Sequence, residues 1–230
     1  VTLIMAGVYR GMIDDAQALL DNSGADLWVV QQDTLGPYAE PSSLPDDAYR
    51  SVRLTRGVEQ AVNITYLTMQ ARRGSQDVRT MVVGVAPGAS TQPGWPRHLV
   101  AGRHLTHSHY EAVADIASGF ALGDRIQIRR KQYTVVGLTR RMVSSGGDPM
   151  IFIPLKDAQE AQFLKDNDAI WQSRRRTQAN PAFNRPGAPG VLDAVIASQS
   201  SNTSVNAVLV TLQPGHSADE VAQSIERWKR

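Results

Sequence analysis

The stretch NITYLTMQARRGSQDVRTMVVGV, Asn63–Val85, contains two runs rich in β-branched and other apolar residues on either side of Gly74-Ser75-Gln76. Such runs are typical of strands, and glycine tolerates the backbone angles of a tight turn. The stretch therefore predicts a β-hairpin. The fold can be built outward from this hairpin in both directions along the chain.

The residues before the hairpin predict a helix, a strand and a second helix. Apolar residues fall on one helical face over Tyr9–Asp21, and Asn-Ser-Gly follows as a stop signal. ADLWVVQQ, Ala25–Gln32, is short, apolar and bounded by turn formers, which indicates a buried strand. Asp46 can cap the second helix, and Gly57 can end it in a left-handed conformation.

The end of the chain predicts one more strand and helix. VNAVLVTLQPGHSADEVAQSIERW, Val205–Trp228, contains a strand, a Pro-Gly turn and a helix capped near Ser217. Together with the front of the chain it completes an α+β sandwich of the ferredoxin type. We therefore expect one discontinuous subdomain made of residues 1–92 and 203–230.

Residues 93–202 are expected to form an inserted mixed α/β subdomain. Thr106 can cap a helix over HSHYEAVADIA, and the alternation in Gly119–Leu138 predicts a hairpin that turns at Lys131-Gln132. MIFIP predicts a strand and KDAQEAQFL a helix. Residues 171–190 are rich in Arg, Asn, Pro and Gly, which indicates a mobile exposed loop.

The composition excludes several classes of protein. The formal charge is only +2, so a nucleic-acid partner is not indicated. The absence of cysteine removes disulfides and thiolate sites but leaves the compartment open. No run of about 20 apolar residues occurs, so the sequence predicts no spanning segment. Val1–Tyr9 could be the last turns of a membrane helix or the start of an ordinary buried helix.

Common catalytic and cofactor motifs are missing from the sequence. It contains no phosphate-binding loop, dinucleotide fingerprint, nucleophile elbow or HExxH zinc motif. We therefore predict no catalytic residue, no cofactor and no metal site. Gly123-Asp124 could place a carboxylate at a ligand, but a turn that leads into a strand also requires these residues. Trp28, flanked by valines, is expected to fill the core or an interface.

Two clusters remain as candidate binding residues. His104, His107 and His109 lie near Glu111, but on a helix that begins at Thr106 they would not converge on one tetrahedral metal, which favours an exposed helix start. Arg174, Arg175 and Arg176 form a charge run that is either solvated or in contact with an acidic partner or lipid headgroups.

The order of several segments resembles the extracytoplasmic core domain of MacB-like ABC transporter permeases, a group that includes FtsX and the lipoprotein-release permeases. These segments are GADLWVVQQ, VVGVAPG, AGRHLT, GFALGDRIQI, YTVVGL and MIFIPLKDAQ. The segment DAVIASQSSNTSVNAVLVTLQPG is similar to the DevC permeases of cyanobacterial exporters. The segment RRRTQANPAFNRPGAPG departs from MacB, so the adaptor contacts of MacB do not transfer directly.

The resemblance implies a domain between the first two of four membrane helices, facing the periplasm from the inner membrane. It implies a porter-like subdomain with a Sabre-like subdomain inserted into it. It also implies a permease homodimer, a separate cytoplasmic ATPase subunit, a periplasmic adaptor of the membrane fusion type and an outer-membrane channel, as in tripartite efflux. Glycolipids or other envelope substrates are the implied cargo.

Three functions remain open from the sequence. The first is a non-catalytic transporter domain that docks an adaptor and transmits ATP-driven motion. The second is a lipid- or solute-holding module like that of lipoprotein-release transporters, which would need a continuous apolar groove. The third is a metal-dependent envelope hydrolase that uses the histidine cluster.

We predict that the 230-residue chain neither binds nor hydrolyses ATP, because it lacks the glycine-rich loop that holds phosphates. Isothermal titration calorimetry with ATP and Mg²⁺ should give no saturable heat. Saturable binding at millimolar affinity or tighter would contradict the prediction.

Overall fold

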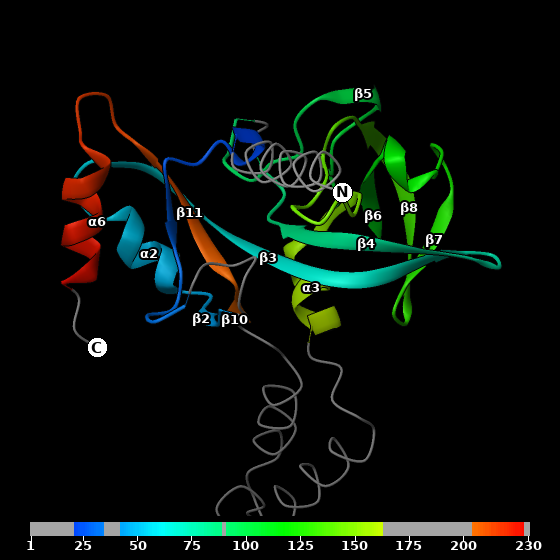
Figure 1. Ribbon diagram of the computed structural model, residues 1–230, viewed down its shortest axis with the longest axis horizontal. Coiled ribbons are helices and arrows are strands. Elements are labelled where there is room, and N and C mark those ends of the chain that lie inside the picture. The colour runs from blue at the N-terminus through cyan, green and yellow to red at the C-terminus, as the bar shows by residue number, and fades with distance from the viewer. Residues whose placement is uncertain (1–20, 35–41, 89–90, 163–203, 228–230) are drawn as a thin grey trace, which may run out of the picture.

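The fold is seen in a computed structural model, which describes residues 21–34, 42–88, 91–162 and 204–227. Strands and helices of the described residues form a mixed sheet with helices packed against it, so the predicted α+β class is confirmed (Figure 1). The elements are β1 Leu27–Val29, β2 Leu44–Pro45, α2 Ala48–Arg53, β3 Val58–Arg73, β4 Gln76–Val85, β5 Leu99–Gly102, β6 Glu111–Asp115, the short 3-10 helix η1 Ile116–Ser118, β7 Arg125–Ile128, β8 Lys131–Thr139, β9 Met150–Pro154, α3 Leu155–Gln162, β10 Ser204–Val205, β11 Ala207–Leu212 and α6 Ala218–Glu226.

The predicted hairpin is confirmed and is the longest feature of the sheet. β3 has 16 residues and pairs with β4 from Ile64↔Val85 to Arg73↔Gln76. Gly74 in the turn has a φ of 60°, a left-handed angle that glycine adopts without strain. In the alternation along β4, Val82 packs in one core cluster and Val83 in another, so both faces of the sheet are covered.

The end of the chain returns to the front, as predicted. β11 lies between β1 and β3 and is antiparallel to both. The helices α2 and α6 contribute Val52 and Val221 to a cluster that also contains Val208 and Val210 of β11. Ser217 is the N-cap of α6, as expected, whereas Asp47 rather than Asp46 is the N-cap of α2.

The first predicted helix, Tyr9–Asp21, lies mostly outside the described residues. Only its last residue, Asp21, is described, and residues 21–23 are helical. Trp228, at the other end of the chain, is also outside the described residues.

Six strands of the described residues close into a small barrel. β4 pairs with β9, β9 with β6, β6 with β8, β8 with β7, and β7 pairs back with β3 at Ala71↔Ile128 and Arg72↔Gln127. A barrel this narrow has room only for side chains inside it. The cluster that fills it is Met69, Ala71, Val82, Ala112, Ala114, Phe120, Ile126, Ile128, Tyr133, Val135, Ile151 and Ile153, with Ala158 and Ala161 added by α3.

The sheet runs across the predicted boundary between the two subdomains. β4 lies before residue 93 and pairs with β9 after it, and β3 pairs with β7 across the same boundary. The MIFIP strand and the helix that follows it are confirmed as β9 and α3. The division into residues 1–92 with 203–230 and residues 93–202 stays a prediction.

The helix predicted after Thr106 is wrong, because its second half is the strand β6. All five residues of Glu111–Asp115 are buried, between the parallel partner β8 and the antiparallel partner β9. A strand buried on both faces loses the apolar-polar alternation that marks strands. Its run of alanine and valine therefore fits a helical spacing equally well.

The hairpin predicted within Gly119–Leu138 is confirmed as β7 and β8, with Ile126 and Ile128 buried. Its turn lies at Arg129-Arg130, two residues before the predicted Lys131-Gln132, which pair within the ladder. Arg129 has a φ of 57°, so a non-glycine residue takes the left-handed position that the turn requires.

Gly84 of β4 lies where α3 meets the sheet. A Cβ atom at this position would overlap Thr65 and Ala158. We expect Gly84→Ala to lower the free energy of unfolding by about 1–3 kcal/mol, because α3 would be pushed off the sheet. Urea denaturation measures the change. Gly146→Ala is the matched control, since its nearest neighbour would be Ser144 Oγ at 3.7 Å, and equal effects of the two substitutions would contradict the prediction.

Candidate interaction surface

Arg174, Arg175 and Arg176, the partner-binding residues predicted from the sequence, lie outside the described residues. The same is true of the predicted loop at residues 171–190. Their role as a contact therefore stays a prediction. The described residues place the other candidates, and these fall into two buried polar clusters and one arginine-rich surface.

Glu111 is the centre of the first polar cluster, at the start of β6. Its carboxylate accepts hydrogen bonds from Arg103 and from the backbone N–H groups of Thr106 (2.8 Å) and His107 (3.1 Å), and it lies 2.6 Å from His107 Nδ1. Burial acts to raise the pKa of Glu111, but the bonds from Arg103, Thr106 and His107 outweigh it and lower that pKa well below its usual value. The cluster therefore fixes the chain before β6.

Asp157 of α3 is the centre of the second cluster and is fully buried. It accepts from the backbone N–H of Tyr110 (3.0 Å) and from Lys131 Nζ (3.2 Å), and it lies 2.7 Å from His109 Nδ1. Lys131 also pairs with Glu160. Burial acts to lower the pKa of Lys131, but its bonds to Glu160 and Asp157 raise it overall. This cluster ties α3 to the barrel.

The three histidines do not converge. His107 lies beside Glu111, His109 beside Asp157, and His104 packs against Trp95 with ring centroids 5.6 Å apart. Burial lowers the pKa of His104. Within the described ranges, no three His, Asp or Glu side chains are grouped so that they could hold a metal ion. The expected separation of His107 from His109 is thus confirmed, although the helix used to derive it is not.

Asp124 joins two hairpins that are far apart in the sequence. It accepts from the backbone N–H of Ala121 (2.8 Å) and from Arg73 Nη1 (2.6 Å), and both bonds lower its pKa. The turn interpretation of Gly123-Asp124 is therefore confirmed. The partner Arg73 was missed, because nothing in either segment signals a contact across 51 residues.

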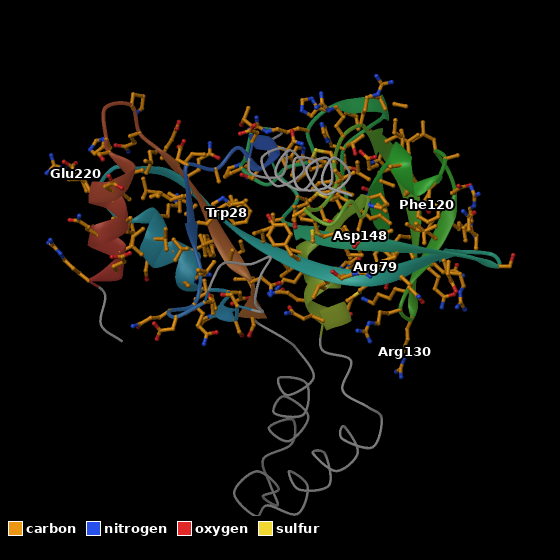
Figure 2. All side chains as sticks on the ribbon, in the orientation of Figure 1. Trp28, Arg79, Phe120, Arg130, Asp148 and Glu220 are labelled. Atoms are coloured by element: carbon orange, nitrogen blue, oxygen red, sulfur yellow. The ribbon has the colours of Figure 1, made fainter. Side chains whose placement is uncertain are left out.

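An arginine-rich surface lies on the outside of the barrel, beside the contact between β3 and β7. Among the described residues, Arg72–Asp77 (2.6 Å) and Arg79–Asp148 (3.2 Å) are ion pairs there, and the pair Arg73–Asp124 (2.6 Å) lies next to this surface, where Arg73 also contacts Phe120. Three further arginines, Arg125, Arg129 and Arg130, come from β7 and its turn, and all three are exposed. In Figure 2, Arg130 projects from the end of this turn, while Arg79 and Asp148 lie together nearer the centre.

Trp28 is half-buried and stacks on Tyr66, with ring centroids 5.8 Å apart. It packs against the cluster on the sheet face opposite the barrel interior, which confirms the interpretation as core.

No helix in the part of the chain that the structure describes is long and apolar enough to cross a bilayer.

Known proteins share this arrangement of strands. The family model for the MacB-like periplasmic core domain matches residues 1–228. The chain belongs to this family. The periplasmic region of MacB from Actinobacillus actinomycetemcomitans has the same fold, with a TM-score of 0.54, 10% identity, and coverage of 91% of this chain and 86% of that chain. The predicted family is therefore confirmed.

Two relatives of this MacB-like domain are described as uncharacterised ABC transporter permeases. One, from Mycobacterium tuberculosis, is 24% identical over 215 residues, which is 91% of this chain and 60% of the relative. The other, from Mycobacterium bovis, is 23% identical over 163 residues, 71% of this chain and 45% of the relative. The chain thus spans about half of the length of the relatives that it matches.

Replacing Glu111 with Gln should lower the free energy of unfolding at pH 7 by about 1–3 kcal/mol, because Arg103 and two backbone N–H groups lose a charged acceptor. The pKa of Glu111 is lower in the folded chain, so its contribution is complete above the unfolded pKa of about 4.3 and is lost as the pH falls toward the folded pKa. Urea titrations at pH 7 and 3.5 should therefore give a smaller difference at the lower pH.

Glu59→Gln is the control for this prediction, since Glu59 is exposed on β3. Its effect should be close to zero at both pH values. A penalty for Glu111→Gln that stays constant between pH 7 and 3.5 would show that the charge of Glu111 contributes nothing.

Proposed function

We propose that the chain is the extracytoplasmic domain of an ABC exporter permease, related to DevC, and that it docks a periplasmic adaptor and transmits motion driven by ATP. In this proposal the permease lies in the inner membrane as a homodimer. A separate cytoplasmic subunit hydrolyses ATP, and the adaptor connects the permease with an outer-membrane channel. The cargo is an envelope substrate such as a glycolipid.

Family membership and the permease names of the two mycobacterial relatives support the transporter part of the proposal. The observation that supports the mechanical part best is the single strand β3. Its first half pairs with β11, which leads into α6 at the C-terminal end of the described chain. Its second half pairs with β4 and β7 of the barrel.

In this proposal, movement of one end of β3 is passed to the other, because the two ends belong to one continuous strand that is paired with β4 from Ile64 to Arg73. Figure 1 shows α6 at one end of the sheet and the β7–β8 hairpin at the opposite end, with β3 running between them. A force applied near α6 would reach the barrel through β3. A docked adaptor on the barrel would then receive it.

The arginine run at residues 174–176 is the proposed adaptor contact. Replacing Arg174, Arg175 and Arg176 with Glu in the full permease should weaken co-purification with the adaptor by tenfold or more, because three attractive charges become repulsive. Export of the cargo should fall with it. Circular dichroism of the 230-residue chain should be unchanged.

The matched control changes three exposed arginines in the part of the fold around α2 and α6, namely Arg53, Arg56 and Arg227. It alters the net charge by the same amount and should leave adaptor binding within about twofold, as expected for surface charges away from an interface. Equal losses from both triple variants would overturn Arg174–Arg176 as the specific contact. Loss of export with intact adaptor binding, together with co-purified lipid, would favour a lipid-holding module instead.

A further inference from the structure

One edge of β3 is open between its two strand partners. The edge opposite β4 pairs with β11 over Val58–Ile64 and with β7 over Ala71–Arg72. In the described ranges, no strand pairs with residues 65–70 on this edge. An open edge presents backbone donors and acceptors that can pair with another strand.

The backbone of Thr68 faces this open edge. Asn206 covers the edge just before it, since its N–H donates to Ile64 O (3.1 Å) and its Oδ1 accepts from Tyr66 N–H (2.9 Å). Alternate residues of a strand direct their backbone groups to the same edge, so the N–H and C=O of Thr68 are the next pair. No described residue forms a backbone hydrogen bond with Thr68 there.

A surface hollow lies directly beside this edge. It is lined by Thr68, Met69, Gln70, Arg72, Asp77, Gln127 and Arg129. Thr68, Gln70 and Arg72 are exposed, whereas Met69 is buried in the barrel cluster. A strand added along this edge would therefore place alternate side chains over the arginine-rich surface and the others beside Met69.

The charge around the hollow selects the type of strand. Among the described residues that line the hollow are two arginines, Arg72 and Arg129, and one acid, Asp77, which is already in an ion pair with Arg72. The surface therefore has an excess of positive charge. An added strand is favoured when the side chains that it places over this surface are acidic.

We propose that the open edge of β3 binds an extended acidic segment of a partner protein by strand addition. Main-chain hydrogen bonds form with Thr68, and alternate carboxylates of the segment lie near Arg72 and Arg129. Residues 67–70, between the bond of Asn206 to Tyr66 and the first β7 pair, leave room for about four partner residues, or roughly 13 Å of strand. The inference rests on the proposed role of the chain as a docking domain and gives that role a site in the described fold.

The open edge and the arginines together favour a peptide over an anionic lipid. Both ligands satisfy the positive charge. Only a peptide also supplies N–H donors and C=O acceptors at the two-residue spacing of the edge. The backbone contribution therefore distinguishes the two ligands.

Fluorescence anisotropy with the 230-residue chain tests the proposal. The probe is a labelled, capped peptide of alternating Glu and Val, six residues long. It should bind with a submillimolar Kd, and a Lys-Val peptide of the same length should bind at least tenfold more weakly. Because the Glu residues lie opposite Thr68 in the proposed pairing, N-methylation of the Glu amides should abolish binding, whereas N-methylation of the Val amides should leave it within about threefold.

Two variants locate the site. Arg129→Glu should weaken the peptide at least tenfold, since it reverses a charge that lines the hollow. Arg140→Glu makes the same charge change at an exposed position outside the hollow and should have less than a twofold effect. Hydrogen exchange should show new protection of the Thr68 amide with the Glu-Val peptide.

Three results would overturn the proposal: no binding at millimolar peptide, equal binding of the two N-methylated peptides, or displacement of the peptide by phosphatidylglycerol vesicles with no protection of Thr68. The last result would indicate an anionic lipid surface. The peptide assay needs no adaptor, so it can succeed when adaptor docking at Arg174–Arg176 fails, and it can fail when that docking succeeds.

Discussion

The fold depends on one strand, β3, having two partners along the same edge. β11 occupies the first half of that edge and β7 only two residues near its end. The first pairing joins the end of the chain to its front, and the second closes the barrel. The second pairing is short and needs further support. The ion pair between Arg73 and Asp124 lies next to the two residue pairs that join β3 and β7, and so supports the closure. The Cζ atom of Arg73 also lies 5.9 Å from the centroid of the Phe120 ring. Arg73 therefore makes both an ion pair and a cation–π contact beside the pairing of β3 with β7.

The two buried acids, Glu111 and Asp157, satisfy backbone groups of the chain that leads into β6. β6 is central and buried, so the irregular chain that leads into it must satisfy its backbone groups without a strand partner. Glu111 accepts from two of those N–H groups and Asp157 from a third, that of Tyr110. Arg103 and Lys131 balance the two charges. The histidines and acids that resemble a metal-ligand set in the sequence therefore have a structural role. They hold the loop before β6 in place.

The elements that the sequence predicted correctly are those whose signal is local. The hairpin at Gly74 and the strand-turn-helix at the end of the chain carry their turns and apolar patterns within about 25 residues, and both are present. The strand β6 was mistaken for a helix because burial on both faces removed its alternation. Barrel closure was not predictable, since it rests on pairings such as β4 with β9 and β3 with β7, between segments about 50 to 70 residues apart along the chain. The partner Arg73 of Asp124 was missed for the same reason.

The short closure also explains why β3 keeps an open edge between its two strand partners. Closing a six-stranded ring with full ladders would require β7 to pair along all of residues 65–72, yet β7 has only four residues and turns at Arg129. The positive φ of Arg129 takes the chain away from β3 at the point where further pairing would begin. The interior is filled by Met69 and its neighbours, so the barrel keeps its packing without those hydrogen bonds. The unpaired backbone of β3 is therefore a consequence of how the barrel is closed. It lies on a strand that also pairs with β11, which leads to the C-terminal helix α6, so anything bound there would be attached directly to an element that joins the barrel to the end of the described chain.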